Sequence, residues 1–505
     1  MIRQYFFSTR CRAAGLLCLL GAAAIGPAAP LHAQAESGLD TRLRLDQQLD
    51  RQRADKESET LEGAEPLDGA PASMTIDGET YAVGNNVTDM GQALYIAVQR
   101  KQWTDARRFL DAYQKLAGYD PMLRLYARGA LAREKGDLAA AERDYRELLA
   151  IRPDFLPGQL ELARALFENR KDREAERAFD TVRARLAADG PKAEGVGRTV
   201  EAFLAVLKRR RSWQGSLAIG PRYSSNLNQS SASYTCLLAA DDGSCLIDRK
   251  VPDPIRSTGI GVEATLNSRL PLRGHSGLRA RAILFGDYYP GHHAFSQATL
   301  IARLGYDYQT ARDSFSVSPS VDLSTLGSSL LYRAWGLNAE WSRSLSDKAM
   351  IKLEGNRRRF DYRLPAYQAQ DGDLTDLFLT GWYLMRGDWT LFGGPDFLEK
   401  TADDPVNAYR QWGVRLGVNK SFGNSVGVLL MASARERKHR AYSELFEAQR
   451  RDRELGFTAI ARFPALAFAG LVPEAVVQHN RVKSNIDWLY SHKRTAISLR
   501  LEYAF

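Results

Sequence analysis

From Trp213 onward, apolar and polar side chains alternate along the chain, and this pattern limits its fold more than any other feature. A period of two is the period of a β-strand, because successive side chains point to opposite faces. The segment "AISLRLEYAF" shows the pattern well, with Ser498, Arg500 and Glu502 on one face. The opposite face is apolar and carries Ile497, Leu499, Leu501, Tyr503 and Phe505. Such strands must bury one face in a protein core or turn it toward lipid.

The length and contents of the segments favour lipid over the core of a soluble β-sandwich. They run for about ten residues or more, as tilted membrane-spanning strands do, whereas soluble strands average about five to six. Tyr and Trp cluster near segment ends, as in Trp213 and Tyr223. Arg and Glu recur in mid-segment on the polar face, where a water-filled lumen would solvate them. We therefore expect an outer-membrane β-barrel.

Fourteen such segments can be counted, and an even number suits a single-chain bacterial barrel. Both barrel ends would then face the periplasm and the longer polar loops would face outward. Cys236 and Cys245 lie in the longest loop, and we expect them to form a disulfide; the alternative is two free thiols. The expected strands are 213–223, 256–269, 277–288, 296–309, 314–324, 331–343, 348–359, 375–386, 388–400, 408–421, 426–438, 452–463, 471–483 and 493–505.

The last of these segments, which ends at Phe505, is expected to be the closing strand. A strand that pairs with the first one has no free edge and needs no polar tail to protect it. Alternating apolar residues ending in Phe are also similar to the signal that the barrel-assembly machinery recognises. We expect Ile497, Leu499, Leu501, Tyr503 and Phe505 to form this insertion signal.

The N-terminal region indicates export from the cytoplasm. Arg3, Arg10 and Arg12 precede an apolar run at 13–25, which predicts a signal peptide over 1–35 with cleavage after residue 33 or 35. The next segment, 36–74, begins with heavily charged residues. We expect 36–62 to be a solvated helix or disordered, and the Gly/Pro/Ala-rich remainder to be a linker.

Residues 75–207 are expected to form a helical domain built on a repeat of about 34 residues, the length of a tetratricopeptide unit. In such units small residues let paired helices approach, an aromatic residue fills the gap and a proline ends the second helix. The alternative is an ordinary helical bundle. The positions assigned to this packing are Gly129, Ala141, Tyr145, Pro153, Ala163, Ala175 and Phe179.

Stacked units of this kind form a concave groove for peptides or protein surfaces. Among the side chains expected to be exposed on this domain, the candidate cargo contacts are Arg124, Arg128, Arg164 and Asn169, although a plain solvated helix residue is the commoner explanation for each.

No pattern in the chain indicates catalysis, a cofactor or a metal site. The adjacent His292 and His293 lack a third ligand. The formal charge of +9 falls to +6 when the three signal-peptide arginines are removed (9 − 3), which is a weak argument for nucleic acid. The basic runs at 356–360 and 435–440 could contact lipopolysaccharide phosphates or an acidic cargo, or could be solvated loop residues.

The order of these parts resembles the Slam family, the surface lipoprotein assembly modulators of Gram-negative bacteria (type XI secretion). The similar stretches are "YAVGNNVTDMGQALYIAVQRKQW", "RPDFLPGQLELARALFENRKDREAERAF" and "RRRSWQGSLAIGPRYSSNLNQ", the last including Asn226-Leu227-Asn228. The resemblance covers about residues 75–505. It implies a periplasmic tetratricopeptide domain before a 14-stranded antiparallel transmembrane barrel at 208–505.

The resemblance also implies a function without catalytic residues. Family members help lipoproteins, or related soluble haem- or metal-binding proteins, to reach the cell surface. The expected partners are an exported protein cargo, outer-membrane lipid and lipopolysaccharide, the barrel-assembly machinery and periplasmic chaperones. The alternative function is exopolysaccharide export through a barrel with a helical domain; an outer-membrane enzyme and a diffusion porin are less well supported.

Overall fold

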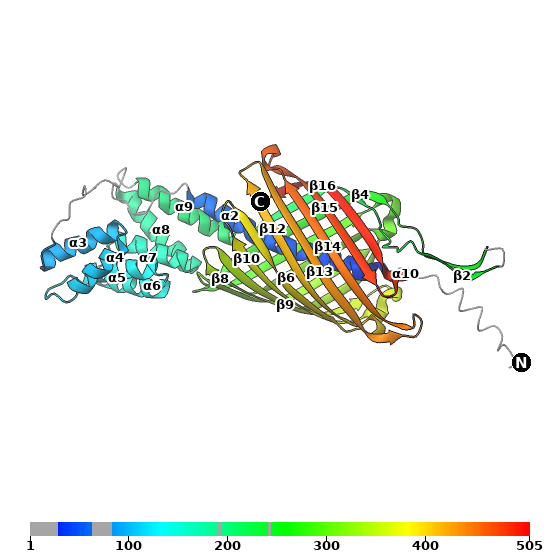
Figure 1. Cartoon of the computed structure of the whole chain (residues 1–505). Coiled ribbons are helices and arrows are strands. Elements are labelled where there is room, and N and C mark those ends of the chain that lie inside the picture. The colour runs from blue at the N-terminus through cyan, green and yellow to red at the C-terminus, as the bar shows by residue number, and fades with distance from the viewer. Residues whose placement is uncertain (1–28, 63–82, 190–193, 241–243) are drawn as a thin grey trace, which may run out of the picture.

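The computed structural model describes residues 29–62, 83–189, 194–240 and 244–505. A helical domain stands at one end of a long β-barrel, and one further helix runs along the barrel axis (Figure 1). Most of the expected signal peptide and the expected linker at 63–74 lie outside the described residues.

Among the residues that the structure describes, seven helices make up the domain beside the barrel, and helices that follow one another in the chain are in contact. Several of these helices begin at a side-chain cap or a proline. The side chains of Asn86, Asp120 and Asp137, for example, accept hydrogen bonds from the first-turn amides of the next helices. The helices are α3 (Val87–Gln99), α4 (Trp103–Tyr113), α5 (Pro121–Glu134), α6 (Leu138–Ile151), α7 (Leu156–Glu168), α8 (Asp172–Asp189) and α9 (Glu194–Arg211).

The residues assigned to repeat packing lie between these helices. Ala141, Ala163 and Ala175 are fully buried, as are the rings of Tyr145 and Phe179. At Gly129 in α5, an added Cβ would stand 2.7 Å from the ring of Tyr145 in α6, so the absence of a side chain lets the two helices approach. Pro153 lies in the turn between α6 and α7.

The barrel is a closed sheet of fourteen antiparallel strands, as the alternation predicts. Each strand pairs with its neighbours in the barrel sequence, and β1 also pairs with β16, which closes the ring. The barrel strands are β1 (Gln214–Ser224), β4 (Ser257–Pro271), β5 (Ser276–Tyr288), β6 (Gln297–Gln309), β7 (Asp313–Leu326), β8 (Ser329–Ser346), β9 (Ala349–Tyr362), β10 (Gly372–Leu384), β11 (Trp389–Lys400), β12 (Tyr409–Phe422), β13 (Val426–Ser443), β14 (Ala448–Arg462), β15 (Leu471–Ser484) and β16 (His492–Ala504).

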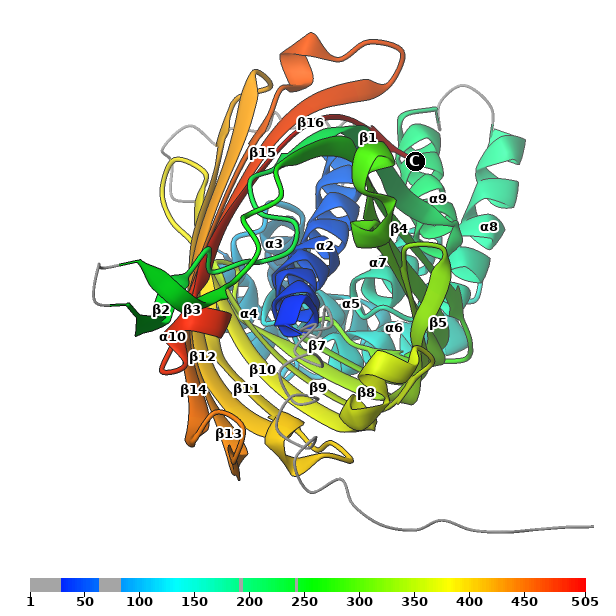
Figure 2. The same cartoon turned by 90° about the vertical axis from the view of Figure 1, so that its right-hand side faces the viewer.

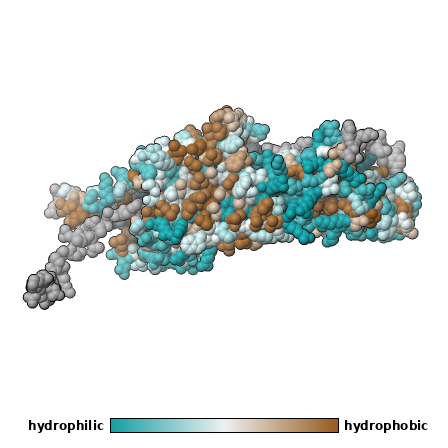
Figure 3. Space-filling model, turned by 180° about the vertical axis from the view of Figure 1, so that it is seen from behind, coloured by the Kyte–Doolittle hydropathy of each residue, from teal (hydrophilic) through white to brown (hydrophobic). Residues whose placement is uncertain are grey.

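The closing pair extends to the last residue of the chain. Gly215 and Phe505 exchange two backbone hydrogen bonds of 3.0 Å. Along β16 the two faces differ sharply, since Leu499 is 60% exposed on the outside and Glu502 is 1% exposed on the inside. Apolar residues gather on the outer wall of the barrel (Figure 3). The outer wall is therefore the surface that meets lipid.

The two ends of the barrel differ in their connections. Most turns on the side of the helical domain are tight, whereas the opposite side carries longer loops with short helical turns. The longest of these loops contains a hairpin of β2 (Tyr234–Ala239) and β3 (Cys245–Lys250), and Cys236 and Cys245 form a disulfide across it. Asn226 anchors the start of this loop by donating to the carbonyls of Ser230 and Lys493.

The charged N-terminal segment corrects one sequence expectation. It forms a helix, α2 (Ala29–Glu62), but the helix is not solvated, because it lies inside the ring of strands (Figure 2). Leu39, Leu43, Leu45 and Leu49 are all buried there. Charged residues also become buried on this helix, because the lumen wall offers partners for them.

We predict that Gly129→Ala will lower the free energy of unfolding of the helical domain by about 1–3 kcal/mol, because the added methyl group overlaps the Tyr145 ring. The matched control is Gly197→Ala in α9, where nothing lies within 4 Å of the added Cβ. This control should leave stability unchanged or raise it by up to about 1 kcal/mol. Thermal unfolding followed by the helical circular dichroism signal measures both, and equal midpoints for Gly129→Ala and wild type would contradict the packing argument.

Candidate functional site in the barrel lumen

The lumen wall is lined by charged side chains that are almost completely buried. They come from the inward-facing positions of nearly every strand, and both signs are represented. The buried cations include Arg269, Arg281, Arg303, Arg358, Arg415, Arg435, Arg437 and Arg500, and the buried anions include Glu263, Asp307, Asp322, Glu340, Glu354, Asp376, Asp396, Glu454, Glu474 and Glu502. A buried charge is tolerated only where a partner of opposite charge compensates it.

Much of this compensation occurs between adjacent or next-but-one strands of the wall itself. Arg500 of β16 contacts Glu263 at 2.7 Å and Glu474 at 2.9 Å. Arg358 of β9 contacts Asp322 of β7 at 2.6 Å and also pairs with Asp376 of β10. The wall is thus largely neutralised across its own strands.

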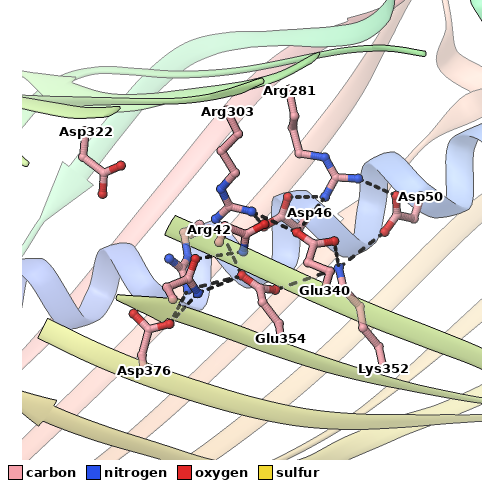
Figure 4. A network of polar contacts seen from close by, with 12 residues as sticks. Arg42, Asp46, Asp50, Arg281, Arg303, Asp322, Glu340, Lys352, Glu354 and Asp376 are labelled. Atoms are coloured by element: carbon pink, nitrogen blue, oxygen red, sulfur yellow. Dashed lines mark hydrogen bonds and ion pairs between the residues drawn. The ribbon is translucent and has the colours of Figure 1, made fainter. Parts of the chain in front are cut away.

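The centre of α2 contacts a cluster on one side of the wall (Figure 4). Arg281 of β5 donates to Asp46 at 2.7 Å and to Asp50 at 2.8 Å, so one guanidinium holds two carboxylates one helical turn apart. Lys352 of β9 lies 3.8 Å from Asp50 and 3.0 Å from Glu340. These contacts fix both the rotation of α2 and its depth in the lumen.

The outer part of α2 contacts other strands. Asp40 accepts hydrogen bonds from Ser433 Oγ and Arg435 Nη1 of β13, both at 3.1 Å. Arg42 lies 3.5 Å from Asp376 and 3.7 Å from Glu354.

The opposite face of α2 is also in contact with the wall. Arg44 donates to Glu263 at 2.6 Å, while Gln48 and Gln52 donate to Glu502 at 2.8 and 3.1 Å. A smaller apolar contact joins Leu39 and Leu43 to Phe378 and Leu398. The wall therefore contacts α2 from several directions, and the helix occupies the passage.

At the periplasmic mouth, α2 joins the helical domain through a chain of ion pairs that we call the collar. It consists of Glu57, Arg170, Asp172, Arg210, Arg269 and Asp307. Glu57 of α2 pairs with Arg170 and Arg210, and Arg210 contacts Asp172 at 2.6 Å. Asp172 also lies 3.0 Å from Arg269 of β4, which contacts Asp307 at 2.5 Å. The collar thus links α2, the helical domain and the barrel.

Glu57 is strongly stabilised as an anion within the collar. Burial opposes its ionisation, but the charges and hydrogen bonds of Arg170 and Arg210 outweigh burial and lower the pKa of Glu57 from 4.5 to about 2. Glu57 therefore stays ionised at periplasmic pH.

The candidate cargo residues have different surroundings. Arg128 is exposed and pairs with Asp144 at 3.1 Å, Arg124 stacks on Tyr119, and Arg164 pairs with Glu161 and Glu168 on its own helix. Asn169 was expected to be exposed, but it is only 8% exposed. It ends α7 at the junction with α8, where the helical domain meets the barrel, and this position withdraws it from solvent.

The two basic runs are divided by the strand period rather than clustered on one surface. In the first run Arg358 points into the lumen, whereas Arg357 and Arg359 are exposed and pair with Asp373. In the second run Arg435, Arg437 and His439 are buried in the lumen, and Lys438 and Arg440 are exposed. The lumen-facing bases of both runs are therefore unavailable to lipopolysaccharide.

Within the described residues, no group of three or more His, Cys, Asp or Glu side chains is placed to hold a metal ion. His292 contacts the hydroxyl of Ser257, and His293 makes an edge-to-face contact with the ring of Tyr288. Of the helices that the structure describes, none is long and apolar enough to span a membrane.

Comparisons with known proteins agree with this architecture. A family model described as "Surface lipoprotein assembly modifier" matches residues 213–505, and one for the N-terminal TPR repeats of the same family matches 79–179. The hemophilin secretion modulator of Acinetobacter baumannii is 37% identical over 481 residues, covering 92% of this chain and 96% of that protein. This chain belongs to the surface lipoprotein assembly modifier family.

More distant members of the family match a smaller but still large share of the chain. Surface lipoprotein assembly modifier 1 of Neisseria meningitidis serogroup B is 26% identical over 430 residues, covering 82% of each chain. The surface lipoprotein assembly modifier of Haemophilus influenzae strain 86-028NP is 25% identical over 428 residues, covering 82% of this chain and 83% of that protein. This family member is accordingly an outer-membrane protein whose helical domain lies in the periplasm.

Sequence reasoning did not identify the α2 contacts or the collar of this surface lipoprotein assembly modifier. One signal was available in retrospect. The lumen-facing positions carry arginines and carboxylates in similar numbers, and segment 36–62 combines the same two signs with regularly placed leucines. A segment with that composition can pair with such a wall.

We predict that Arg210→Ala will loosen the inner end of α2. It removes the charge-assisted hydrogen bonds of Arg210 to Glu57 and Asp172, a loss of about 3 kcal/mol in total, although Glu57 keeps Arg170 and Asp172 keeps Arg269. Hydrogen–deuterium exchange of the α2 amides should then be about a hundredfold faster, if local opening controls it. Lys208→Ala, an exposed charge two residues away, is the control and should leave exchange unchanged. Wild-type exchange in Arg210→Ala would rule out the collar as an anchor.

The pKa of Glu57 gives a pH prediction. Because its folded pKa of about 2 lies below the ordinary value of 4.5, its contribution to stability is complete above pH 4.5 and is lost as pH falls toward 2. A nitroxide attached at the exposed position Ala54→Cys should therefore give the same spectrum from pH 8 to pH 5 and become more mobile only below pH 4.5. A mobility change between pH 8 and pH 5 would show that another group controls the contact.

Proposed function

We propose that this protein helps a specific protein cargo to cross the outer membrane, and that the cargo is a surface lipoprotein or a soluble haem- or metal-binding protein. The observation that carries the proposal is the family match over both domains, together with the names of its members. Relatives are named for surface lipoprotein assembly and, in the 37% identical case, for hemophilin secretion. Polysaccharide export, the alternative, has no comparable support.

The arrangement of the two domains supports a division of labour. The helical domain stands at the periplasmic mouth of the barrel, where a cargo leaving the inner membrane would first meet this protein (Figure 1). Its stacked helices provide a surface of the kind that binds peptides and protein segments. Arg124, Arg128 and Arg164 stay candidate contacts on that surface, whereas the burial of Asn169 removes it from the set.

We also propose that the role is not enzymatic, with folding of the cargo outside the cell as the source of energy. Further partners would be the barrel-assembly machinery, which would read the segment from Ile497 to Phe505, together with outer-membrane lipid and periplasmic chaperones. The exposed bases Arg357, Arg359, Lys438 and Arg440 would be the ones to meet lipopolysaccharide.

The test is a comparison of the surface-exposed and secreted proteomes of cells with and without this protein. At least one lipoprotein or haem- or metal-binding protein should leave the surface and accumulate in the periplasm when the protein is absent. If no protein changes its location, the proposed function is wrong.

A shorter deletion then tests the helical domain. Deleting 83–151 removes α3–α6 but keeps α7–α9, which share a separate apolar core around Phe167 and Phe179, and keeps the collar. We predict that the barrel will still insert, as judged by heat-modifiable mobility on gels, and that cargo display will fall at least about tenfold. Full display by this variant would exclude α3–α6 from cargo handling.

A further inference from the structure

Helix α2 is held in the lumen mainly by polar contacts that water could replace. Its contacts with the wall include ion pairs and hydrogen bonds from Asp40, Arg42, Arg44, Asp46 and Asp50. The apolar contribution comes from four buried leucines, of which Leu39 and Leu43 pack against Phe378 and Leu398. A cavity of about 150 Å³ also lies between the wall and the outer part of the helix, beside Leu39 and Arg42. This packing differs from the continuous hydrogen bonding that holds the strands together.

The wall would stay largely compensated if α2 left. Glu263 would lose Arg44 but keep Arg500 at 2.7 Å. Asp376 would lose Arg42 but keep Arg358, and Arg435 would lose Asp40 but keep Asp396 at 3.5 Å. Removing one partner of a buried ion pair is costly chiefly because the other charge is left alone. Here a second partner is already present, so departure of α2 exposes few isolated charges.

The anchor of α2 lies at the mouth that faces the helical domain. Glu57 pairs with Arg170 and Arg210, and Arg209 donates to Lys56 O at 3.1 Å and to Thr60 Oγ1 at 3.0 Å. Leu61 packs against the apolar core of α7–α9. The helical domain, which we propose meets the cargo, therefore also controls the inner end of the helix that fills the passage.

We propose that α2 is a releasable plug and that the lumen wall beneath it is a binding surface for an unfolded segment of the exported protein. The inference rests on the proposed function. The space that α2 fills is that of one helix, about 10–12 Å across with its side chains, so it admits a single chain segment and not a folded domain. A wall that carries both signs of charge binds a hydrated polypeptide of mixed charge, as α2 itself demonstrates.

The plug is tested first without any cargo. Asp46→Asn combined with Asp50→Asn removes both carboxylates from Arg281 with little change in shape and leaves the barrel wall intact. In planar lipid bilayers the full-length variant should show conducting openings at least about tenfold more often than wild type, because it loses two charge-assisted hydrogen bonds. The matched control, Asp111→Asn with Glu147→Gln, removes two exposed carboxylates from the helical domain and should conduct like wild type.

The cargo route is tested by locking the plug. Asp40→Cys and Ser433→Cys place thiols where the native side chains meet at 3.1 Å, in a background with Cys236→Ser and Cys245→Ser. Cells carrying the oxidised protein should lose cargo display, and a reductant should restore it. Asp40→Cys alone should display cargo under both conditions, which separates the lock from loss of the Asp40 ion pair.

Two results would overturn the inference. Unchanged conductance of the Asn variant would show that these contacts do not hold a plug. If cargo display still depends on this protein and the locked protein gives full display, cargo crosses without release of α2. The proposed function would then stand, and the lumen route would be wrong. If cargo display does not depend on the presence of this protein at all, the proposed function is wrong.

Discussion

The structure depends on one constraint, which is that backbone amides and carbonyls in hydrocarbon have no water to bond with. The ring of strands meets this constraint by closing, and the exchange of hydrogen bonds between Gly215 and Phe505 extends the closing pair. Closure also fixes the two faces of every strand. Leu499 then meets lipid while Arg500 and Glu502 point inward, where they must find partners because the lumen gives them little solvent.

The charged side chains inside the barrel need partners of opposite charge, and this need explains how the lumen is filled. Inter-strand pairs such as those of Arg500 and Arg358 compensate much of the wall, and α2 supplies the carboxylates that Arg281 and Arg435 face. The helix is charged for the same reason that the wall is. Buried charges are paired in the same way in the collar, where Arg210 lies between a carboxylate of α2 and one of the helical domain.

The barrel and the helical domain could be predicted because their signals are local. Alternation along each strand and the spacing of small residues such as Gly129 and Ala163 can be read over a few tens of residues. The prediction of fourteen strands and the prediction of the family were both correct on that basis. The position of α2 could not be predicted in this way, because its partners are remote. Asp46 and Arg281 are 235 positions apart, and Gln48 and Glu502 are 454 apart. A charged helix with distant partners has the same local pattern as a solvated one.

Two smaller differences between the sequence expectations and the structure concern Asn169 and the basic run at 435–440. Asn169 follows a helix in the manner of an exposed cap, but it is buried where the helical domain meets the barrel. The basic run at 435–440 looks like one patch in the sequence, but a strand sends its neighbours to opposite sides, so Arg435 and Arg437 belong to the lumen. A tertiary contact decides the first case, whereas the period of two along β13 decides the second.

The path of α2 through a closed ring also bears on how the molecule is made. Helix α2 precedes the first strand in the chain, yet it lies along the axis of a barrel that is closed by the pairing of β1 with β16. Threading has two routes: the strands curl around the helix before the seam is sealed, or the helix slides in through an open mouth afterwards. In the first route the strands assemble around α2, which acts as a template for the sheet. In the second route the barrel closes first and its lumen is empty until α2 enters.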